Sequence, residues 1–276
     1  ADALGLHVTL FPIVRLIRPG PGEWRGKIAP ADEDAWWSSY DAFVLRAAAL
    51  AAQTDTERLS VGSELLTRER MRGRWARLIE TIRLRYPALE LMYSANWDHY
   101  RPVRFWDLVD VVGLTAYWEV GRGLPPRGGR ARVAALEAAW RGPRRELARL
   151  SADFGREIVL TEVGYPSLEG GSRYPWDETR EAPVDLEEQR DAYEAFARAL
   201  GGRPFLRGVY FWNWFGFGGP EDGDYTPRRK PAARVLECWF TAPRRGASPS
   251  PARGEGAPPA AAPPRARSRS GRPRPR

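Results

Sequence analysis

The sequence predicts an α/β fold in which parallel strands form most of a (β/α)8 barrel. Apolar, strand-like stretches alternate with longer stretches of helical spacing, which is typical of parallel sheets with right-handed crossovers. The 276 residues suffice for one domain of barrel size. The ends of the predicted strands carry carboxylates, amides and large aromatics, and the active sites of such barrels lie at that end.

The first half of the chain predicts three strands and two helices. Residues 5–16 form an apolar run that enters a Gly/Pro-rich loop, which indicates a buried strand. Residues 34–52 have the apolar spacing of a long helix. Residues 58–61 and 89–95 are short apolar runs and are predicted strands. Between them, residues 68–85 have amphipathic spacing and end just before Pro87, which indicates a helix.

The second half predicts three more strands. The stretch 108–116 is rich in Val, and 157–161 and 206–212 are further apolar runs bounded by polar residues. Helical spacing covers residues 130–154, with a break near Gly142 and Pro143, and then 186–200 and 231–239. This gives about six of eight βα units. Because the first strand begins almost at residue 1 and the chain starts with Ala, we expect the first two units of the barrel to be missing.

A doubly wound open sheet that is complete at six strands is the alternative fold. Such sheets usually carry a Gly-rich phosphate loop between a strand and a helix. The nearest candidate, residues 215–220, follows a strand but opens no helix. The barrel is therefore the favoured interpretation.

The positive charge lies in a C-terminal tail. The formal net charge is +8, and residues 243–276 hold nine Arg and one Glu, which leaves 34 basic and 34 acidic residues before them. The predicted domain, residues 1–241, is thus electrically balanced, which argues against a nucleic-acid groove on it. We predict that residues 242–276, rich in Pro, Ala and Arg, form a disordered tail. A weak contact of this tail with nucleic acid or an acidic partner stays open.

Several classes of protein are disfavoured by composition. No apolar run approaches the roughly 20 residues of a membrane span. A single cysteine, Cys238, permits no intrachain disulfide, and we expect it to be a buried thiol in the last helix. Localisation stays open between cytoplasm and secretion. The sequence has only two His and one Cys, without the spacing typical of zinc ligands, which disfavours a zinc site. We predict neither a metal nor a cofactor.

Two glutamates follow predicted strands and are the candidate catalytic residues. Glu64 comes after residues 58–61, and Glu162 comes directly after residues 157–161. A carboxylate just past a buried strand is poorly placed for packing but well placed for chemistry at the mouth of a barrel. Either one alone is often a helix-cap partner or a loop ion pair. As a pair they suit a glycosidase that works with two carboxylates.

Aromatic and amide side chains accompany this pair at the other strand ends. Flat aromatic faces with neighbouring hydrogen-bonding groups suit sugars, because C–H faces stack on rings while hydroxyls need donors and acceptors. Trp97 and Trp212 are favoured as cleft residues over core residues, since a buried indole N–H needs a partner. The strand-end residues of this kind include Trp24, Asn96, Trp97, Tyr117 and Trp212.

Five motifs resemble glycoside hydrolase family 113, a family of retaining (β/α)8-barrel enzymes whose known members act on β-mannans. The likeness extends from about residue 4 to residue 240, with the motifs in the family's order. They are Ser-Val-Gly-Ser-Glu64, Tyr93-Ser-Ala-Asn-Trp97-Asp, Asp110-Val-Val-Gly-Leu-Thr-Ala-Tyr117-Trp, Thr161-Glu162-Val-Gly-Tyr165-Pro-Ser and Tyr210-Phe-Trp212-Asn-Trp.

The resemblance implies a role for each matching residue. Glu64 takes the place of the general acid/base and Glu162 that of the nucleophile. Tyr117 would hydrogen-bond the nucleophile, and Trp212 would form the floor of the subsite that holds the cleaved sugar. Trp24 and Trp97 would line neighbouring subsites.

Two departures from the family's pattern bear on substrate binding. Ser63 stands where the wider clan has an Asn that contacts the sugar 2-hydroxyl, so this contact would have a shorter reach. The relatives' Lys-Pro-His stretch at the preceding strand end reads Phe11-Pro12-Ile13 here. Both changes remove polar reach toward a sugar.

The resemblance implies a monomeric glycoside hydrolase that cleaves β-linked sugars, above all β-1,4-mannan or manno-oligosaccharides, by a retaining double displacement. Two alternatives remain open. One is a non-catalytic carbohydrate-binding barrel. The other is a retaining β-glycosidase of the same clan with another sugar specificity.

Overall fold

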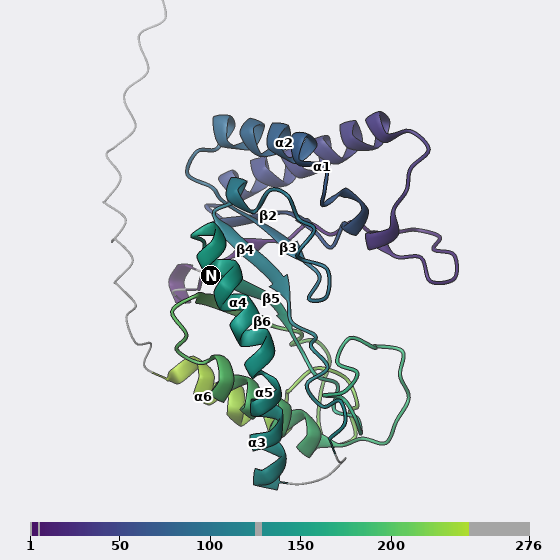
Figure 1. Ribbon diagram of the computed structural model, residues 1–276, viewed down its shortest axis with the longest axis vertical. Helices are drawn as coiled ribbons and strands as arrows, with labels where there is room; N and C mark the ends of the chain where they lie inside the picture. The colour runs from purple at the N-terminus through teal and green to yellow at the C-terminus, as the bar shows by residue number, and fades with distance from the viewer. Residues whose placement is uncertain (1, 5, 125–128, 243–276) are drawn as a thin grey trace, which may run out of the picture. The chain divides into compact units, whose positions relative to one another are not determined.

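A six-stranded parallel sheet forms the centre of the fold, shown here by a computed structural model (Figure 1). The structure describes residues 2–4, 6–124 and 129–242. The strands lie in the sheet in their sequence order, and each pairs in parallel with the next. They are β1 (Thr9–Leu10), β2 (Arg58–Ser63), β3 (Glu90–Ala95), β4 (Val111–Thr115), β5 (Ile158–Val163) and β6 (Leu206–Phe211). This is the α/β half-barrel that the alternating pattern predicts.

Helices connect the strands and cover the sheet. They are α1 (Glu33–Gln53), α2 (Arg72–Arg85), α3 (Gly129–Ala139), α4 (Arg141–Phe154), α5 (Leu186–Leu200) and α6 (Ala232–Thr241). Local chemistry sets several of their ends. The Asp32 carboxylate accepts from the Ala35 N–H at the start of α1, and Asp185 caps α5 in the same way. Gly155 ends α4 in a left-handed conformation.

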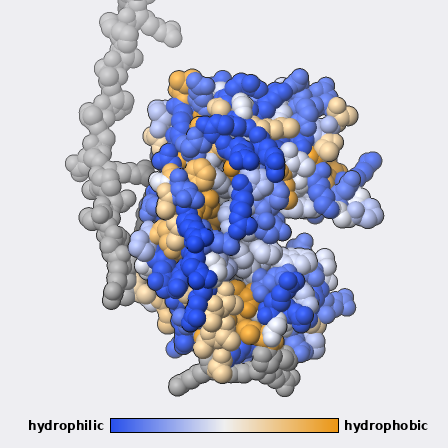
Figure 2. Space-filling model, in the orientation of Figure 1, coloured by the Kyte–Doolittle hydropathy of each residue, from blue (hydrophilic) through white to orange (hydrophobic). Residues whose placement is uncertain are grey.

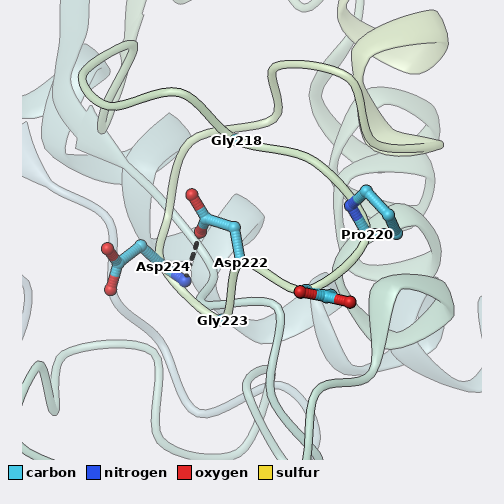
Figure 3. A pocket seen from close by; sticks show the side chains of 6 residues that line it. Gly218, Pro220, Asp222, Gly223 and Asp224 are labelled. Carbon is cyan, nitrogen blue, oxygen red and sulfur yellow. Dashed lines mark hydrogen bonds between the residues drawn. The ribbon is translucent and has the colours of Figure 1, made fainter.

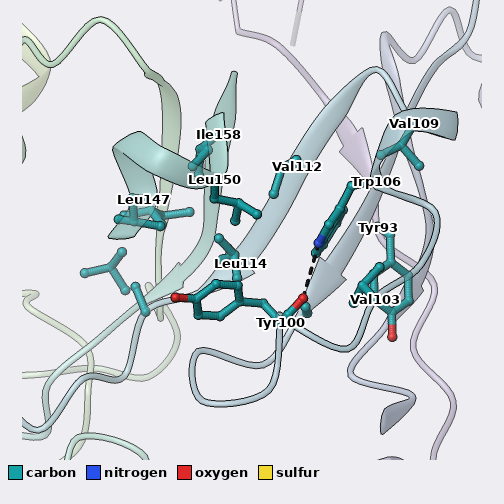
Figure 4. Packing of buried hydrophobic residues seen from close by; sticks show 14 of the residues in the cluster. Tyr93, Tyr100, Val103, Trp106, Val109, Val112, Leu114, Leu147, Leu150 and Ile158 are labelled. Carbon is teal, nitrogen blue, oxygen red and sulfur yellow. Dashed lines mark hydrogen bonds between the residues drawn. The ribbon is translucent and has the colours of Figure 1, made fainter. Parts of the chain in front are cut away.

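The two faces of the sheet have different chemistry. The outer face packs under the helices with large apolar side chains, and Figure 4 shows part of this layer, including Trp106, Leu114 and Leu147. The inner face carries only a small apolar cluster, formed by Met92, Val111 and Val159. Because side chains alternate along a strand, the inner face can be polar without weakening the outer core.

Hydrogen bonds across the inner face show that the sheet is strongly curved. The Ser94 hydroxyl on β3 lies 2.6 Å from the Thr161 hydroxyl on β5, so this contact passes over β4. Thr9 on β1 and Tyr210 on β6, at opposite edges of the sheet, also join through their hydroxyls. The curvature brings strand ends that are separated in the sheet toward one shared mouth.

Some element predictions are wrong in detail. The first predicted strand, 5–16, shrinks to Thr9–Leu10, since Pro12 cannot donate to a sheet ladder. The break in the third long helix falls at Trp140 rather than at Gly142 and Pro143, because Pro is tolerated in the first turn of a new helix. Cys238 is exposed on α6 rather than buried.

Residues Ala1–Ala242 group as one structural unit. The predicted disordered tail lies, apart from Ala242, outside the described residues. The expectation of two further βα units before β1 stays a prediction. Among the described residues, no helix is long and apolar enough to cross a bilayer.

Candidate active site

Glu64 lies directly after β2, where the strand ladder is irregular. Ser60 pairs with Met92, but Ser63 pairs with Ser94, so β2 holds one residue more than β3 over this stretch. Such a bulge re-aims the side chains that follow it. Glu64 itself has a left-handed backbone with φ of +51°, a conformation that costs a non-glycine residue on the order of 1–3 kcal/mol.

Both carboxylate oxygens of Glu64 accept hydrogen bonds. The Thr115 hydroxyl, at the end of β4, donates to Oε1 over 3.1 Å. The Arg25 guanidinium donates to Oε2 and forms an ion pair with it. Glu64 is buried. Burial raises the pKa of Glu64 above its ordinary value, and the Arg25 charge and the Thr115 hydrogen bond oppose that rise.

Glu162 lies inside β5, one residue later than the end predicted for that strand. Here too the ladder shifts, because Leu114 pairs with Leu160 whereas Thr115 pairs with Glu162. The extra residue is Thr161, whose hydroxyl faces Ser94 on the inner face. Without this bulge the period of two would send Thr161 and Glu162 to opposite faces of the sheet.

One hydroxyl holds the Glu162 carboxylate. The Tyr117 hydroxyl, just after β4, donates to Glu162 Oε2 over 2.8 Å. Burial is the main reason why the pKa of Glu162 rises to about 7, and the negative charge of Glu64 raises it further. The Tyr117 hydrogen bond and the Arg25 charge oppose the rise. The protonation of Glu162 therefore depends on the charge of Glu64.

The predicted tryptophans are tied to residues that contact or adjoin the two glutamates. The Trp97 backbone N–H donates to Thr115 Oγ1 over 3.2 Å, and its ring packs edge-on against Trp118. Trp24 immediately precedes Arg25 and is half-buried. The Trp212 N–H donates to the Val163 carbonyl, next to Glu162, over 2.8 Å.

Gly164 lets the end of β6 approach the end of β5. A Cβ at this position would lie 2.3 Å from the Trp212 carbonyl oxygen, which no side chain tolerates. The glycine in the Thr161-Glu162-Val163-Gly164 run is thus explained by the close approach of Trp212. This contact keeps the Trp212 backbone close to the end of β5.

The two predicted polar contact residues differ in their surroundings. Ser63 is buried, and its hydroxyl has no hydrogen-bond partner among the described residues. Asn96 is half-buried, and its backbone carbonyl accepts from the His99 backbone N–H over 2.9 Å. The Ser63 hydroxyl is therefore a polar group with unused capacity directly beside Glu64.

A buried network that the sequence did not predict supports the backbone after Glu64. The Tyr93 hydroxyl accepts from the Leu65 N–H over 2.9 Å and donates to Glu69 over 2.9 Å. Glu69 also contacts the His99 ring at 2.9 Å. Burial raises the pKa of the Glu69 carboxyl, and its hydrogen bonds with His99 and Tyr93 oppose the rise. No local sequence pattern links these residues, whose partners lie 24 to 30 positions away.

A surface pocket lies apart from the two glutamates. It is formed by the loop after β6 and is lined by Gly218, Pro220, Glu221, Asp222, Gly223 and Asp224 (Figure 3). None of the predicted site residues lines it. The nearby Lys230 ammonium is buried and satisfies Asp222, Ser167 and the Asp224 carbonyl, so this loop is internally paired. None of the residues that line this pocket is aromatic.

The segment that carries Trp24 and Arg25 projects from the body between β1 and α1 (Figure 1). The molecular surface is indented beside this segment (Figure 2). Across the described residues, no group of three or more His, Cys, Asp or Glu side chains is arranged to hold a metal ion.

Most of the chain matches the model of one enzyme family. Residues 1–218 match the model of glycoside hydrolase family 113. The chain belongs to this family. In this family 113 chain, Glu64 directly follows β2 and Glu162 lies near the end of β5.

Solved structures of family 113 enzymes have the same fold. The β-mannanase of Alicyclobacillus acidocaldarius in complex with ManMIm superposes with a TM-score of 0.74 at 30% identity, over 87% of this chain and 74% of that one. A structure of a family 113 β-1,4-mannanase and a complex structure of a family 113 β-1,4-mannanase give TM-scores of 0.72 and 0.71 at 24% and 23% identity, each over 88% of this chain and 76% of the other. A search of the curated proteins gave no match.

Proposed function

We propose that this chain hydrolyses β-linked sugars, above all β-1,4-mannan or manno-oligosaccharides, by a retaining double displacement. The observation that carries the proposal is a pair of buried carboxylates, Glu64 and Glu162, in a family 113 chain, where the charge of Glu64 raises the pKa of Glu162. The similarity to proteins named β-mannanases supports the choice of sugar.

In the first step Glu162 is the nucleophile. Its ionised oxygen attacks the anomeric carbon, and the bond from that carbon to the leaving oxygen breaks. Glu64 gives its proton to the leaving oxygen. The Tyr117 hydroxyl holds Glu162 Oε2, which leaves Oε1 to attack. A retaining reaction requires the two carboxyl groups to lie about 5–5.5 Å apart.

In the second step Glu64 acts as a base. It takes a proton from water, the water oxygen bonds to the anomeric carbon, and the bond to Glu162 breaks. Both residues then return to their starting charge. The step needs only the two carboxyls and water.

We assign the surrounding residues to sugar binding. Trp212 would form the floor of the subsite for the cleaved sugar, while Trp24 and Trp97 would stack on neighbouring sugars. Asn96 and Ser63 would hydrogen-bond hydroxyls, and the unpartnered Ser63 Oγ supports this role. We further propose that residues 1–241 act as a monomer with a saccharide as the only partner.

One observation favours a non-catalytic carbohydrate-binding barrel instead. The ion pair between Arg25 and Glu64 occupies an oxygen that an acid catalyst needs. Proton NMR of manno-oligosaccharide hydrolysis separates the alternatives. A retaining enzyme first releases the β-anomer, an inverting enzyme releases the α-anomer, and a binding protein releases neither. A panel of aryl β-glycosides then tells mannosidase from other sugar specificities.

A further inference from the structure

Arg25 is the one cation placed against the candidate catalytic pair by the contacts described above. It opens the short 3-10 turn Arg25–Lys27, and its guanidinium pairs with Glu64 Oε2. Its Nε is buried without a hydrogen-bond partner among the described residues. The guanidinium carbon lies 5.9 Å from the centroid of the Trp24 ring. The guanidinium is therefore held by the carboxylate and the ring, while its Nε–H is left without an acceptor among the described residues.

The contacts of Glu64 favour its ionised form. Oε2 faces Arg25, and Oε1 accepts from Thr115, whose own oxygen already accepts from the Trp97 N–H. Each carboxylate oxygen has two lone pairs, so these contacts do not block a proton. They are stronger with an ionised carboxyl than with a neutral one, and they therefore oppose protonation of Glu64.

The other groups identified near the pair are acidic or phenolic, apart from the Tyr117 hydroxyl that donates to Glu162. They are Glu69 and Asp98 near Glu64, and Tyr225 and Glu178 near Glu162. The charge of Asp98 raises the pKa of Glu64 and so acts against Arg25, which is the larger of the two charge effects there. Arg25 acts on both glutamates but contacts only Glu64.

We propose that Arg25 decides which glutamate of the pair carries the shared proton, and that substrate must draw it from Glu64 before Glu64 can act as an acid. In the free protein the proton then rests on Glu162 and Glu64 stays ionised. This is the reverse of the state that a retaining attack requires. A bound sugar would reset the pair by giving Arg25 another acceptor, such as a hydroxyl. The inference rests on the retaining function proposed above.

Carboxyl carbon NMR of the full chain, labelled with [δ-13C]glutamate, tests this without turnover. Glu64→Gln and Glu162→Gln assign the two signals. In the unsubstituted chain, Glu64 is expected to titrate at lower pH than Glu162. In Arg25→Gln, the Glu64 midpoint is expected to rise by about one unit or more, since an opposite charge this close lowers a carboxyl pKa by roughly 1–3 units.

Lys27→Gln is the matched control. Lys27 lies in the same turn and bonds the Gly22 carbonyl over 2.8 Å, away from both glutamates. It is expected to leave both midpoints unchanged. The proposal is overturned if Lys27→Gln shifts Glu64 as much as Arg25→Gln does, or if Arg25→Gln leaves the Glu64 midpoint unmoved. An inverted order of midpoints in the unsubstituted chain overturns it as well, whether or not Arg25→Gln folds.

The pH dependence of kcat/KM on manno-oligosaccharides gives the second readout. Removing the Arg25 charge raises the pKa of both carboxyls, so both limbs of the profile should move to higher pH. A merely structural Arg25 would lower the rate at every pH without moving the limbs. A chain that hydrolyses no sugar but shows the NMR shift refutes the proposed function and keeps the assignment of Arg25. A chain that hydrolyses sugar but shows neither the NMR shift nor the movement of the limbs refutes the assignment of Arg25 and keeps the proposed function.

Discussion

The surroundings of Glu64 and Glu162 differ, although both residues follow a bulge at the end of a parallel strand. Glu64 turns away from β2 with a left-handed backbone and meets a cation. Glu162 stays within β5 and meets only a neutral hydroxyl, from Tyr117. The negative charge of Glu64 is thus paired with a positive charge, whereas that of Glu162 is not. Two chemically identical groups are set up for different protonation states by what the neighbouring strand ends supply.

The largest expected effect separates the two roles. Glu162→Gln removes the attacking oxygen and should lower kcat/KM by a factor on the order of 10⁴ or more. Glu64→Gln should cost roughly 10²–10⁴ on manno-oligosaccharides, because only proton transfer is lost. A dinitrophenyl mannoside needs no proton for departure of its phenolate. On that substrate the first step should recover in Glu64→Gln and stay lost in Glu162→Gln.

The uncompensated burial of Glu162 should cost stability at neutral pH. Its pKa is raised to about 7 in the folded state, so between about pH 4.5 and 7 the unfolded chain binds fewer protons than the folded one. Stability therefore falls as pH rises through this range. Glu162→Gln should be more stable than the unsubstituted chain by on the order of 3 kcal/mol at pH 8, with little difference at pH 4.5.

Urea unfolding at the two pH values measures this difference. Glu221→Gln, which replaces an exposed carboxylate, serves as the control and should show no such pH dependence. Equal free energies of unfolding for Glu162→Gln and the unsubstituted chain at pH 8 would show that burial of the Glu162 carboxylate does not lower stability.

Tyr117→Phe should weaken the Glu162 side alone. A hydrogen bond to a charged group contributes about 1.5–3 kcal/mol, so kcat should fall roughly 10- to 100-fold. In the unsubstituted chain this hydrogen bond lowers the pKa of Glu162. Its loss should raise that pKa, so the acidic limb of the pH profile should move to higher pH. A drop in kcat without movement of that limb would contradict the contact's role in ionising Glu162.

The smallest expected effect concerns the backbone that follows Glu64. Tyr93→Phe leaves the Leu65 N–H and the buried Glu69 carboxylate each without one partner, at a cost of about 1–3 kcal/mol. Thermal unfolding should shift down by several degrees. Tyr100→Phe, which removes a hydroxyl bonded to Glu146 away from the two glutamates, is the comparison. An effect of Tyr93→Phe on kcat larger than that of Tyr100→Phe at equal loss of stability would link the network to Glu64.

The sequence was sufficient to predict six strands, though not the length of the first, and to place Glu64 and Glu162 near strand ends. Short apolar runs that end at Glu64 and Glu162 mark strand ends, and parallel topology brings such ends to one edge. The sequence could not reveal the bulges in β2 and β5. Both add one residue to a strand without changing its apolar character, so the strand that contains Glu162 was predicted to end too early.

The partners of the glutamates were less predictable. Tyr117 came from a family motif rather than from spacing. Arg25 and Thr115 escaped because their contacts with Glu64 join residues 39 and 51 positions apart, and an arginine in a loop or a threonine in a strand has no local signature. Exposure of Cys238 was also missed, since the apolar pattern of α6 does not say which side of the helix meets the sheet.

Covalent trapping tests the central claim most directly. A 2-deoxy-2-fluoro-β-mannosyl fluoride or its disaccharide should form a stable glycosyl-enzyme, because the fluorine slows release more than attack in a double displacement. Mass spectrometry of the digested chain should find one added sugar, on the peptide that contains Glu162, and none in Glu162→Gln. A label on Glu64, or hydrolysis of manno-oligosaccharides by a chain that takes up no label, would contradict the account.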